Sequence, residues 1–137
     1  MQENEKRKTV SEQKKFTIYD VWEQFGLTKH WGGINATRRL IELCNITSGQ
    51  YILDIGCGTG YAACLLAKNY QADVVALDIR SKVLEEAKKR IVKENVGNKV
   101  TTIKADAHNL PFRSNTFDAV IAESVLAFCD KIKACSE

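Results

Sequence analysis

The spacing of apolar residues divides the chain into two parts near residue 50. In the first part apolar side chains recur every three or four positions, which predicts helices over residues 16–25 and 34–44. The faces expected to be buried consist of Ile18, Trp22 and Phe25 in the first helix and of Ala36, Leu40, Leu43 and Cys44 in the second.

Continuous apolar runs dominate the second part. Four of them are predicted as strands of a buried sheet, and they cover residues 51–55, 73–78, 99–105 and 117–123. Helices are predicted at 61–70 and at 81–95, the latter with Ser81 as its cap, and another helix is predicted to begin at residue 124. This alternation predicts an α/β fold, a Rossmann-like parallel sheet with flanking helices and right-handed crossovers.

The length of 137 residues fits one domain with a buried core. We expect three segments within it. Residues 1–15 form a flexible polar leader, residues 16–48 an N-terminal helical segment, and residues 49–137 an α/β unit.

Composition and charge argue against several classes of protein. The net charge of +3, from 20 basic and 17 acidic residues, is too small to favour nucleic acid or a membrane surface as a partner. No apolar run approaches the roughly 20 residues of a membrane-spanning helix. The five cysteines form no CxxC pair and only two histidines are present, so no metal site is predicted. An odd cysteine count without a secretory signal is typical of reduced thiols, which predicts a cytoplasmic protein.

Three glycines, Gly56, Gly58 and Gly60, follow the first predicted strand within the sequence YILDIGCGTGY. Ligands of open parallel sheets bind beyond the C-terminal ends of the strands, where this loop is expected to lie. Glycines also form tight turns without a ligand, because they lack a Cβ atom. Their alternation at a strand–helix junction favours the ligand interpretation.

Two aspartates at strand ends point to a nucleoside. Asp78 closes the second predicted strand and is suited to accept hydrogen bonds from ribose hydroxyls. Asp106 follows the third strand, and its carboxylate together with the backbone N–H of Ala107 complements the edge of an adenine. Either aspartate alone is also a common turn former. Tyr61 occupies the place of the last glycine in the dinucleotide fingerprint, which argues against NAD.

The segments ILDIGCGTG, VVALD, ADAHNLPF and FDAVIAESVL resemble the successive motifs of class I S-adenosylmethionine-dependent methyltransferases. The resemblance begins near Ile34, reaches the end of the chain, and is strongest to the branch that includes ubiquinone and menaquinone biosynthesis enzymes. It implies S-adenosyl-L-methionine as the cofactor, S-adenosyl-L-homocysteine as its product, and a small molecule as the methyl acceptor. No metal is implied.

The resemblance also implies roles for individual residues. The methionine part of the cofactor would be held by Asp54, Gly56, Cys57, Gly58, Thr59 and Gly60. Asp78 would bind the ribose hydroxyls, and Ile79 would pack against the adenine. Asp106 and Ala107 would recognise the adenine edge.

The acceptor side is less well defined by the resemblance. Glu123 and Ser124 would border both the methionine part and the acceptor. Glu123 is the candidate catalytic residue, as a base or by orienting the acceptor, and it could equally support a neighbouring residue or start a helix. Tyr19, His30 and Trp31 lie in a segment that often folds over the site in this family. Packing for Trp31 and simple solvent exposure for His30 are the alternatives.

Family members continue past the fourth strand with three more strands. We therefore expect this chain to be the N-terminal, cofactor-binding fragment of a longer enzyme. The fourth strand would then be an exposed sheet edge that allows self-association. Two other functions stay open at this point, an NAD-linked oxidoreductase and a non-catalytic nucleoside-binding module.

Overall fold

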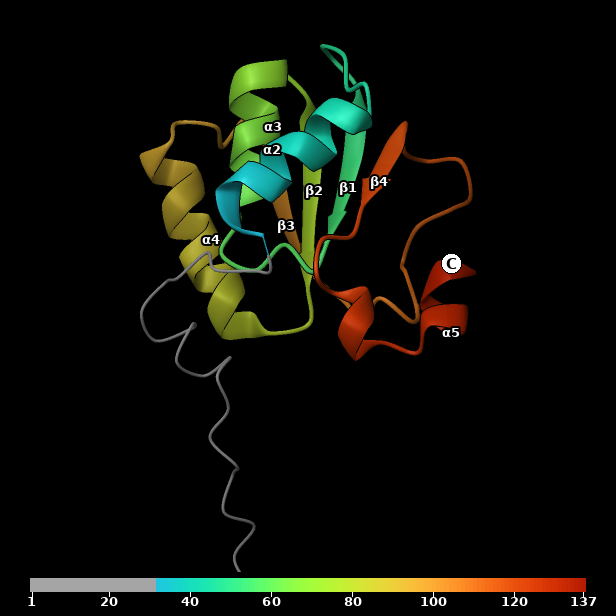
Figure 1. Cartoon of the computed structure of the whole chain (residues 1–137). Helices are drawn as coiled ribbons and strands as arrows, with labels where there is room; N and C mark the ends of the chain where they lie inside the picture. The colour runs from blue at the N-terminus through green and yellow to red at the C-terminus, as the bar shows by residue number, and fades with distance from the viewer. Residues whose placement is uncertain (1–31) are drawn as a thin grey trace, which may run out of the picture.

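The centre of the molecule is a four-stranded sheet (Figure 1). The computed structural model describes residues 32–137, so the leader and the helix predicted at 16–25 lie outside the described residues. The strand order is β3-β2-β1-β4 and all neighbouring strands are parallel. The strands are β1 (Tyr51–Ile55), β2 (Asp73–Asp78), β3 (Val100–Lys104) and β4 (Ala119–Ile121). The predicted parallel α/β fold is therefore confirmed.

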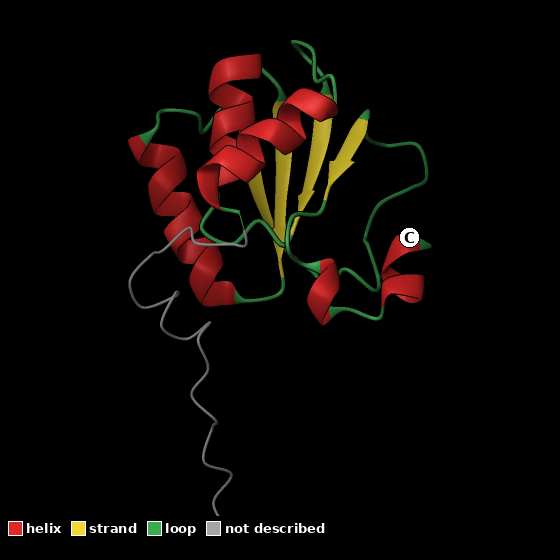
Figure 2. Cartoon of the chain, in the orientation of Figure 1, coloured by secondary structure: helices red, strands yellow, loops and turns green. Residues whose placement is uncertain are grey.

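Helices pack against one face of the sheet, as Figure 2 shows. These helices are α2 (Gly33–Leu43), α3 (Tyr61–Tyr70) and α4 (Ser81–Lys93). Their buried side chains, such as Ile41, Leu66 and Leu84, join Ile52 and Val74 of the sheet in one core cluster. Burying these apolar side chains is the main term that stabilises the layer.

Loop residues cover the other face. Leu53 and Leu77 point to this side, because successive side chains of a strand alternate between faces. They pack with Phe112 and Phe117 from the connection between β3 and β4, and the rings of these two phenylalanines meet edge to face with centroids 4.9 Å apart. The sheet is thus covered on both faces at its centre.

The central strands match their predicted bounds, whereas the outer strands are shorter than predicted. β1 and β2 are buried along almost their whole length because each has neighbours on both sides. β3 and β4 are the edges of the sheet and are only partly buried, and the predicted strand at 117–123 reduces to three residues. Pairing with β1 alone, rather than apolar composition, sets the length of β4.

Three local predictions are wrong. Arg80, not Ser81, is the N-cap residue of α4, and no side chain caps that end. Leu43 and Cys44 are exposed instead of lying in the core, because α2 buries the face that carries Thr37 and Ile41. The segment from residue 124 forms no single helix. It contains the 3-10 helix η1 (Leu126–Phe128) and the short helix α5 (Lys131–Cys135).

All five cysteines are free. No helix within residues 32–137 has both the length and the apolar character to cross a membrane. The same range contains no group of three or more His, Cys, Asp or Glu side chains arranged to hold a metal ion.

Candidate functional site

The strand order reverses at β1, which has β2 on one side and β4 on the other. The crevice beyond the C-terminal ends of such strands is where open α/β sheets bind ligands. Two connections meet there, the glycine-rich loop after β1 (residues 56–60) and the chain that leaves β4. They are in close contact, because a Cβ atom added to Gly56 would lie 2.7 Å from the Cβ atom of Val125.

The glycine-rich loop takes a backbone conformation that side chains disfavour. Gly56, Gly58 and Gly60 have φ angles of 69°, 53° and 77°, in the left-handed region that glycine adopts at little cost. A Cβ atom on Gly60 would also lie 3.1 Å from that of Ala87 in α4. Beside Gly58, in contrast, nothing lies within 4 Å of the added atom. The loop is packed at its two ends and open at its middle glycine.

The carboxylate of Asp78 holds the middle of this loop. The backbone N–H of Gly58 donates to Asp78 Oδ2 over 3.0 Å, and the backbone N–H of Arg80 donates to Oδ1 over 2.9 Å. Asp78 is only 9% exposed. The structure thus brings together the glycine-rich loop and the acidic end of β2, which the sequence marked separately. Ile79, the next residue, exposes 57% of its apolar side chain to solvent.

Asp54 is a buried acid with an unsatisfied oxygen. It is 2% exposed, and within the described residues its Oδ2 atom has no hydrogen-bond partner. Burial, together with the nearby charges of Glu123 and Asp78, raises the pKa of Asp54 to about 7. Buried polar atoms are almost always paired in folded proteins, so such an atom indicates a missing partner.

Thr59 carries a second unsatisfied atom. Its side chain is 7% exposed, and its Oγ1 atom lacks a partner among the residues that the structure describes. Cys57, two positions before it, has its thiol buried, and this burial raises the pKa of the thiol well above its ordinary value. Cys57 is therefore no nucleophile. Its N–H is already bound to the carbonyl of Leu77 over 2.9 Å.

A threonine from α2 reaches the end of β4. Thr37 is 1% exposed, and its Oγ1 atom donates to Oε2 of the half-buried Glu123 over 2.9 Å. Thr37 was not predicted as a site residue because threonine counts as polar in a helical pattern. The signal was its position four residues before Ile41, on the same helical face. Ser124, next to Glu123, is exposed and has a φ angle of 60°.

His108 connects the loop after β3 with the C-terminal helix. Its backbone N–H and its Nδ1 atom both donate to Asp106 Oδ1, over 2.9 and 2.7 Å. Its Nε2 atom accepts from the backbone N–H of Asp130 over 3.0 Å, which assigns the ring proton to Nδ1. The hydrogen bonds from His108 hold the pKa of Asp106 below its usual range. Ala107 between them is 8% exposed.

The predicted site residues thus fall into three groups. One group surrounds the glycine-rich loop and consists of Asp54, Gly56, Cys57, Gly58, Thr59, Gly60, Asp78 and Ile79. Asp106 and Ala107 follow β3, whereas Glu123 and Ser124 follow β4. Tyr19, His30 and Trp31 lie outside the described residues.

Comparison with known families identifies this arrangement. A family model described as a methyltransferase domain matches residues 52–137, more than half of the chain. The chain belongs to this methyltransferase family. The class I S-adenosylmethionine-dependent methyltransferase family that the motifs predicted is confirmed. The methyltransferase interpretation is favoured over the oxidoreductase and the non-catalytic nucleoside-binding module.

Two relatives of the chain are themselves named as methyltransferases. It is 31% identical over 115 residues to demethylmenaquinone methyltransferase of Lactiplantibacillus plantarum, a match that covers 82% of the chain and 46% of that relative. It is 36% identical over 99 residues to an uncharacterised methyltransferase of Bacillus subtilis, covering 72% of the chain and 41% of the relative.

A solved structure shares the fold. Phosphoethanolamine N-methyltransferase 2 of Haemonchus contortus, in complex with S-adenosyl-L-methionine, superposes with a TM-score of 0.72 at 27% identity. The match covers 86% of this chain and 28% of that one. The methyltransferase chain therefore spans less than half the length of each of these three proteins.

Proposed function

We propose that this protein transfers a methyl group from S-adenosyl-L-methionine to a small molecule, and that residues 32–137 provide the cofactor site. One observation carries the proposal. The unsatisfied, buried carboxylate of Asp54 lies at the same crevice as the glycine-rich loop and the carboxylate of Asp78. Such a set of acceptors suits a ligand that brings both cationic groups and ribose hydroxyls.

In this proposal Asp54 supports the ammonium group of the cofactor, directly or through water. A cation beside Asp54 would favour the ionised carboxylate and offset the burial that now raises its pKa to about 7. The hydroxyl of Thr59, which lacks a partner within residues 32–137, is a second candidate contact. The open space beside Gly58 allows a ligand to approach the backbone of the loop closely.

Recognition of the nucleoside is assigned to the ends of β2 and β3. Each oxygen of Asp78 accepts one backbone N–H, and a carboxylate has about four acceptor positions, so lone pairs remain for the ribose hydroxyls. The exposed side chain of Ile79 offers an apolar surface to the adenine. His108 engages Oδ1 of Asp106, so we assign Oδ2 of Asp106 to the adenine amino group and the N–H of Ala107 to the ring nitrogen.

The bound cofactor supplies a methyl group already activated by a cationic sulfonium. The residues of the chain therefore have to align the acceptor and exclude water. Glu123 is held by Thr37 at the border of the crevice, where it could orient the acceptor or accept its proton. We place the acceptor beside Glu123 and Ser124. Tyr19, His30 and Trp31 stay candidates for the substrate side.

Calorimetric titration with S-adenosyl-L-homocysteine tests the proposal, with NAD as the competing ligand. Micromolar binding is expected. Asp78→Ala removes the carboxylate that accepts from two backbone N–H groups and that we assign to the ribose hydroxyls. The affinity of this variant for S-adenosyl-L-homocysteine should therefore fall by more than about tenfold. Asp73→Ala is the matched control, because it removes an aspartate from the opposite end of the same strand. Binding of NAD in place of the homocysteine product would overturn the assignment.

We also propose that the edge of the sheet at β4 allows two copies of the chain to associate. β4 pairs with β1 alone among the described strands, and Val120 on it is 55% exposed. An open edge with an exposed apolar side chain favours pairing with another chain. Sedimentation of the wild type and of Val120→Lys at several concentrations tests this. A wild type that stays monomeric over the whole range refutes it.

The modest net charge of +3 supports a small-molecule acceptor over nucleic acid.

A further inference from the structure

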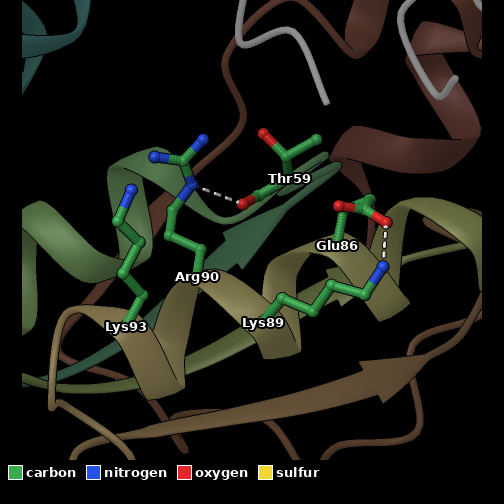
Figure 3. Close-up of a pocket in the computed structure, with 5 residues that line it drawn as sticks. All are labelled: Thr59, Glu86, Lys89, Arg90 and Lys93. Carbon is green, nitrogen blue, oxygen red and sulfur yellow. Dashed lines mark hydrogen bonds and ion pairs between the residues drawn. The ribbon is translucent and has the colours of Figure 1, made fainter. Parts of the chain in front are cut away.

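A second concave site lies between α4 and the glycine-rich loop. It is a cavity of about 190 Å³, lined by Thr59, Glu86, Lys89, Arg90 and Lys93 (Figure 3). None of the carboxylates assigned to the cofactor contributes to its lining. The lining is dominated by charged side chains, three of them cationic and one anionic.

One cation of this cavity is neutralised locally. Lys89 Nζ lies 2.6 Å from Oε1 of Glu86, one turn earlier on α4. Arg90 and Lys93 therefore account for the net positive charge of the cavity lining. Neither forms an ion pair with any residue in the described part of the chain. The cavity therefore carries a surplus of about two positive charges.

Arg90 is held in place from two sides. Its Nε atom donates to the backbone carbonyl of Thr59 over 2.9 Å, and its guanidinium carbon lies 5.9 Å from the centroid of the Tyr61 ring. These contacts leave the two terminal nitrogens of the guanidinium group as donors. In Figure 3 they point to the same side as the ammonium of Lys93. The guanidinium plane is thus fixed before any ligand arrives, which lowers the entropic cost of binding.

We propose that this cavity binds a phosphate group. A planar guanidinium fork can donate two parallel hydrogen bonds to a phosphate, and a neighbouring ammonium adds a third charged donor. Two cations without an ion pair in the described part of the chain match the charge of a phosphate dianion. The same chemistry suits inorganic phosphate and the phosphate end of a small phosphomonoester. The proposal does not depend on methyl transfer, because Arg90 and Lys93 have no role in the proposed cofactor site, although Thr59 borders both sites.

Titration of the ¹⁵N-labelled chain, followed by NMR at constant ionic strength, tests the site. One series uses inorganic phosphate and a second uses glycerol 3-phosphate. We expect saturable shifts of the Arg90 Nε–H and of the backbone amide of Thr59, with a dissociation constant on the order of 1 mM. Lys93→Ala should raise this constant about tenfold through loss of a charged donor. Arg90→Lys should also raise the dissociation constant. This variant retains the charge but loses the planar guanidinium group with its two parallel donors.

Lys88→Ala is the matched control, because Lys88 is exposed on α4 and does not line the cavity. Its dissociation constant should stay within about a factor of two of the wild type. The amide spectrum of each variant reports whether it is folded. Saturation by both ligands supports a site for phosphomonoesters, and saturation by phosphate alone supports a site for the free ion. Absence of saturable shifts in the wild type, or equal weakening by Lys88→Ala and Lys93→Ala, would overturn the proposal.

Discussion

The buried acid Asp54 makes the stability of the ligand-free protein depend on pH. Burial is the main reason that its pKa is raised from 3.8 to about 7. In the unfolded chain the carboxyl group ionises freely, whereas in the folded chain ionisation is penalised. The penalty is absent below about pH 4, grows as the pH rises to about 7, and is complete above that value. Replacement of Asp54 by asparagine removes it.

The size of the effect follows from the shift. The increase of the Asp54 pKa from 3.8 to about 7 corresponds to about 4 kcal/mol, since one pKa unit is worth about 1.4 kcal/mol. Asparagine keeps the shape of the side chain but buries an amide whose donors need partners, at a cost of about 1–3 kcal/mol. We expect Asp54→Asn to be more stable than the wild type by about 1–3 kcal/mol near pH 8. Near pH 5 the two should be similar.

Urea denaturation between about pH 5 and pH 8 measures this, with the free energy of unfolding plotted against pH for both proteins. The wild-type curve should fall relative to the variant as the pH rises. Asp73→Asn is the control, because Asp73 is partly exposed and pairs with Lys99 at the surface. Parallel curves for the wild type and Asp54→Asn would refute the reasoning, since they would mean that Asp54 carries no ionisation penalty.

The same acid links pH to ligand affinity. If the ionised carboxylate holds the ammonium group, the wild-type affinity for S-adenosyl-L-homocysteine should fall by up to about tenfold per pH unit below pH 7. Asp54→Asn should bind more weakly and lose most of this dependence. An equal pH dependence in both proteins would assign the titration to another group.

Two further predictions concern contacts between segments. Gly56→Ala should destabilise the fold by about 1–3 kcal/mol and weaken cofactor binding, because its Cβ atom would meet Val125 at 2.7 Å. Gly58→Ala, with an open surrounding, should lose less stability in the same urea assay, and an equal loss would contradict the role of Val125. His108→Ala should speed hydrogen exchange of the Asp130 amide, which donates to the ring, and unchanged exchange would show that this bond contributes little.

Glycines and strand composition explain which parts of the fold could be predicted. The bounds of β1, α3 and β2 match the prediction because Gly56 and Gly60 separate an apolar strand from an alanine-rich helix. The end of the chain could not be predicted in this way. Asp130 caps α5 by accepting from the backbone N–H groups of Ile132 and Lys133, so the helix starts there and not at residue 124.

The site was predictable where a motif marks it and hidden where tertiary contacts create it. The glycine-rich loop and Asp78 are adjacent in the structure and were recognisable from spacing alone. Thr37 and His108 were missed because each acts through a partner distant in sequence. The hydrogen bond from Thr37 to Glu123 spans 86 positions, and no local pattern encodes such a contact.

The position of β4 in the sheet also bears on the order in which the protein folds. β1 meets β2 across 22 positions, from Ile52 to Val74, but it meets the start of β4 across 67, from Tyr51 to Asp118. Closing the longer loop costs about 1 kcal/mol more, by (3/2)RT ln(67/22). We therefore expect β4 to join the sheet after β1 and β2 have paired. The side of the crevice bordered by Glu123 would then form last, on a half of the sheet that already exists.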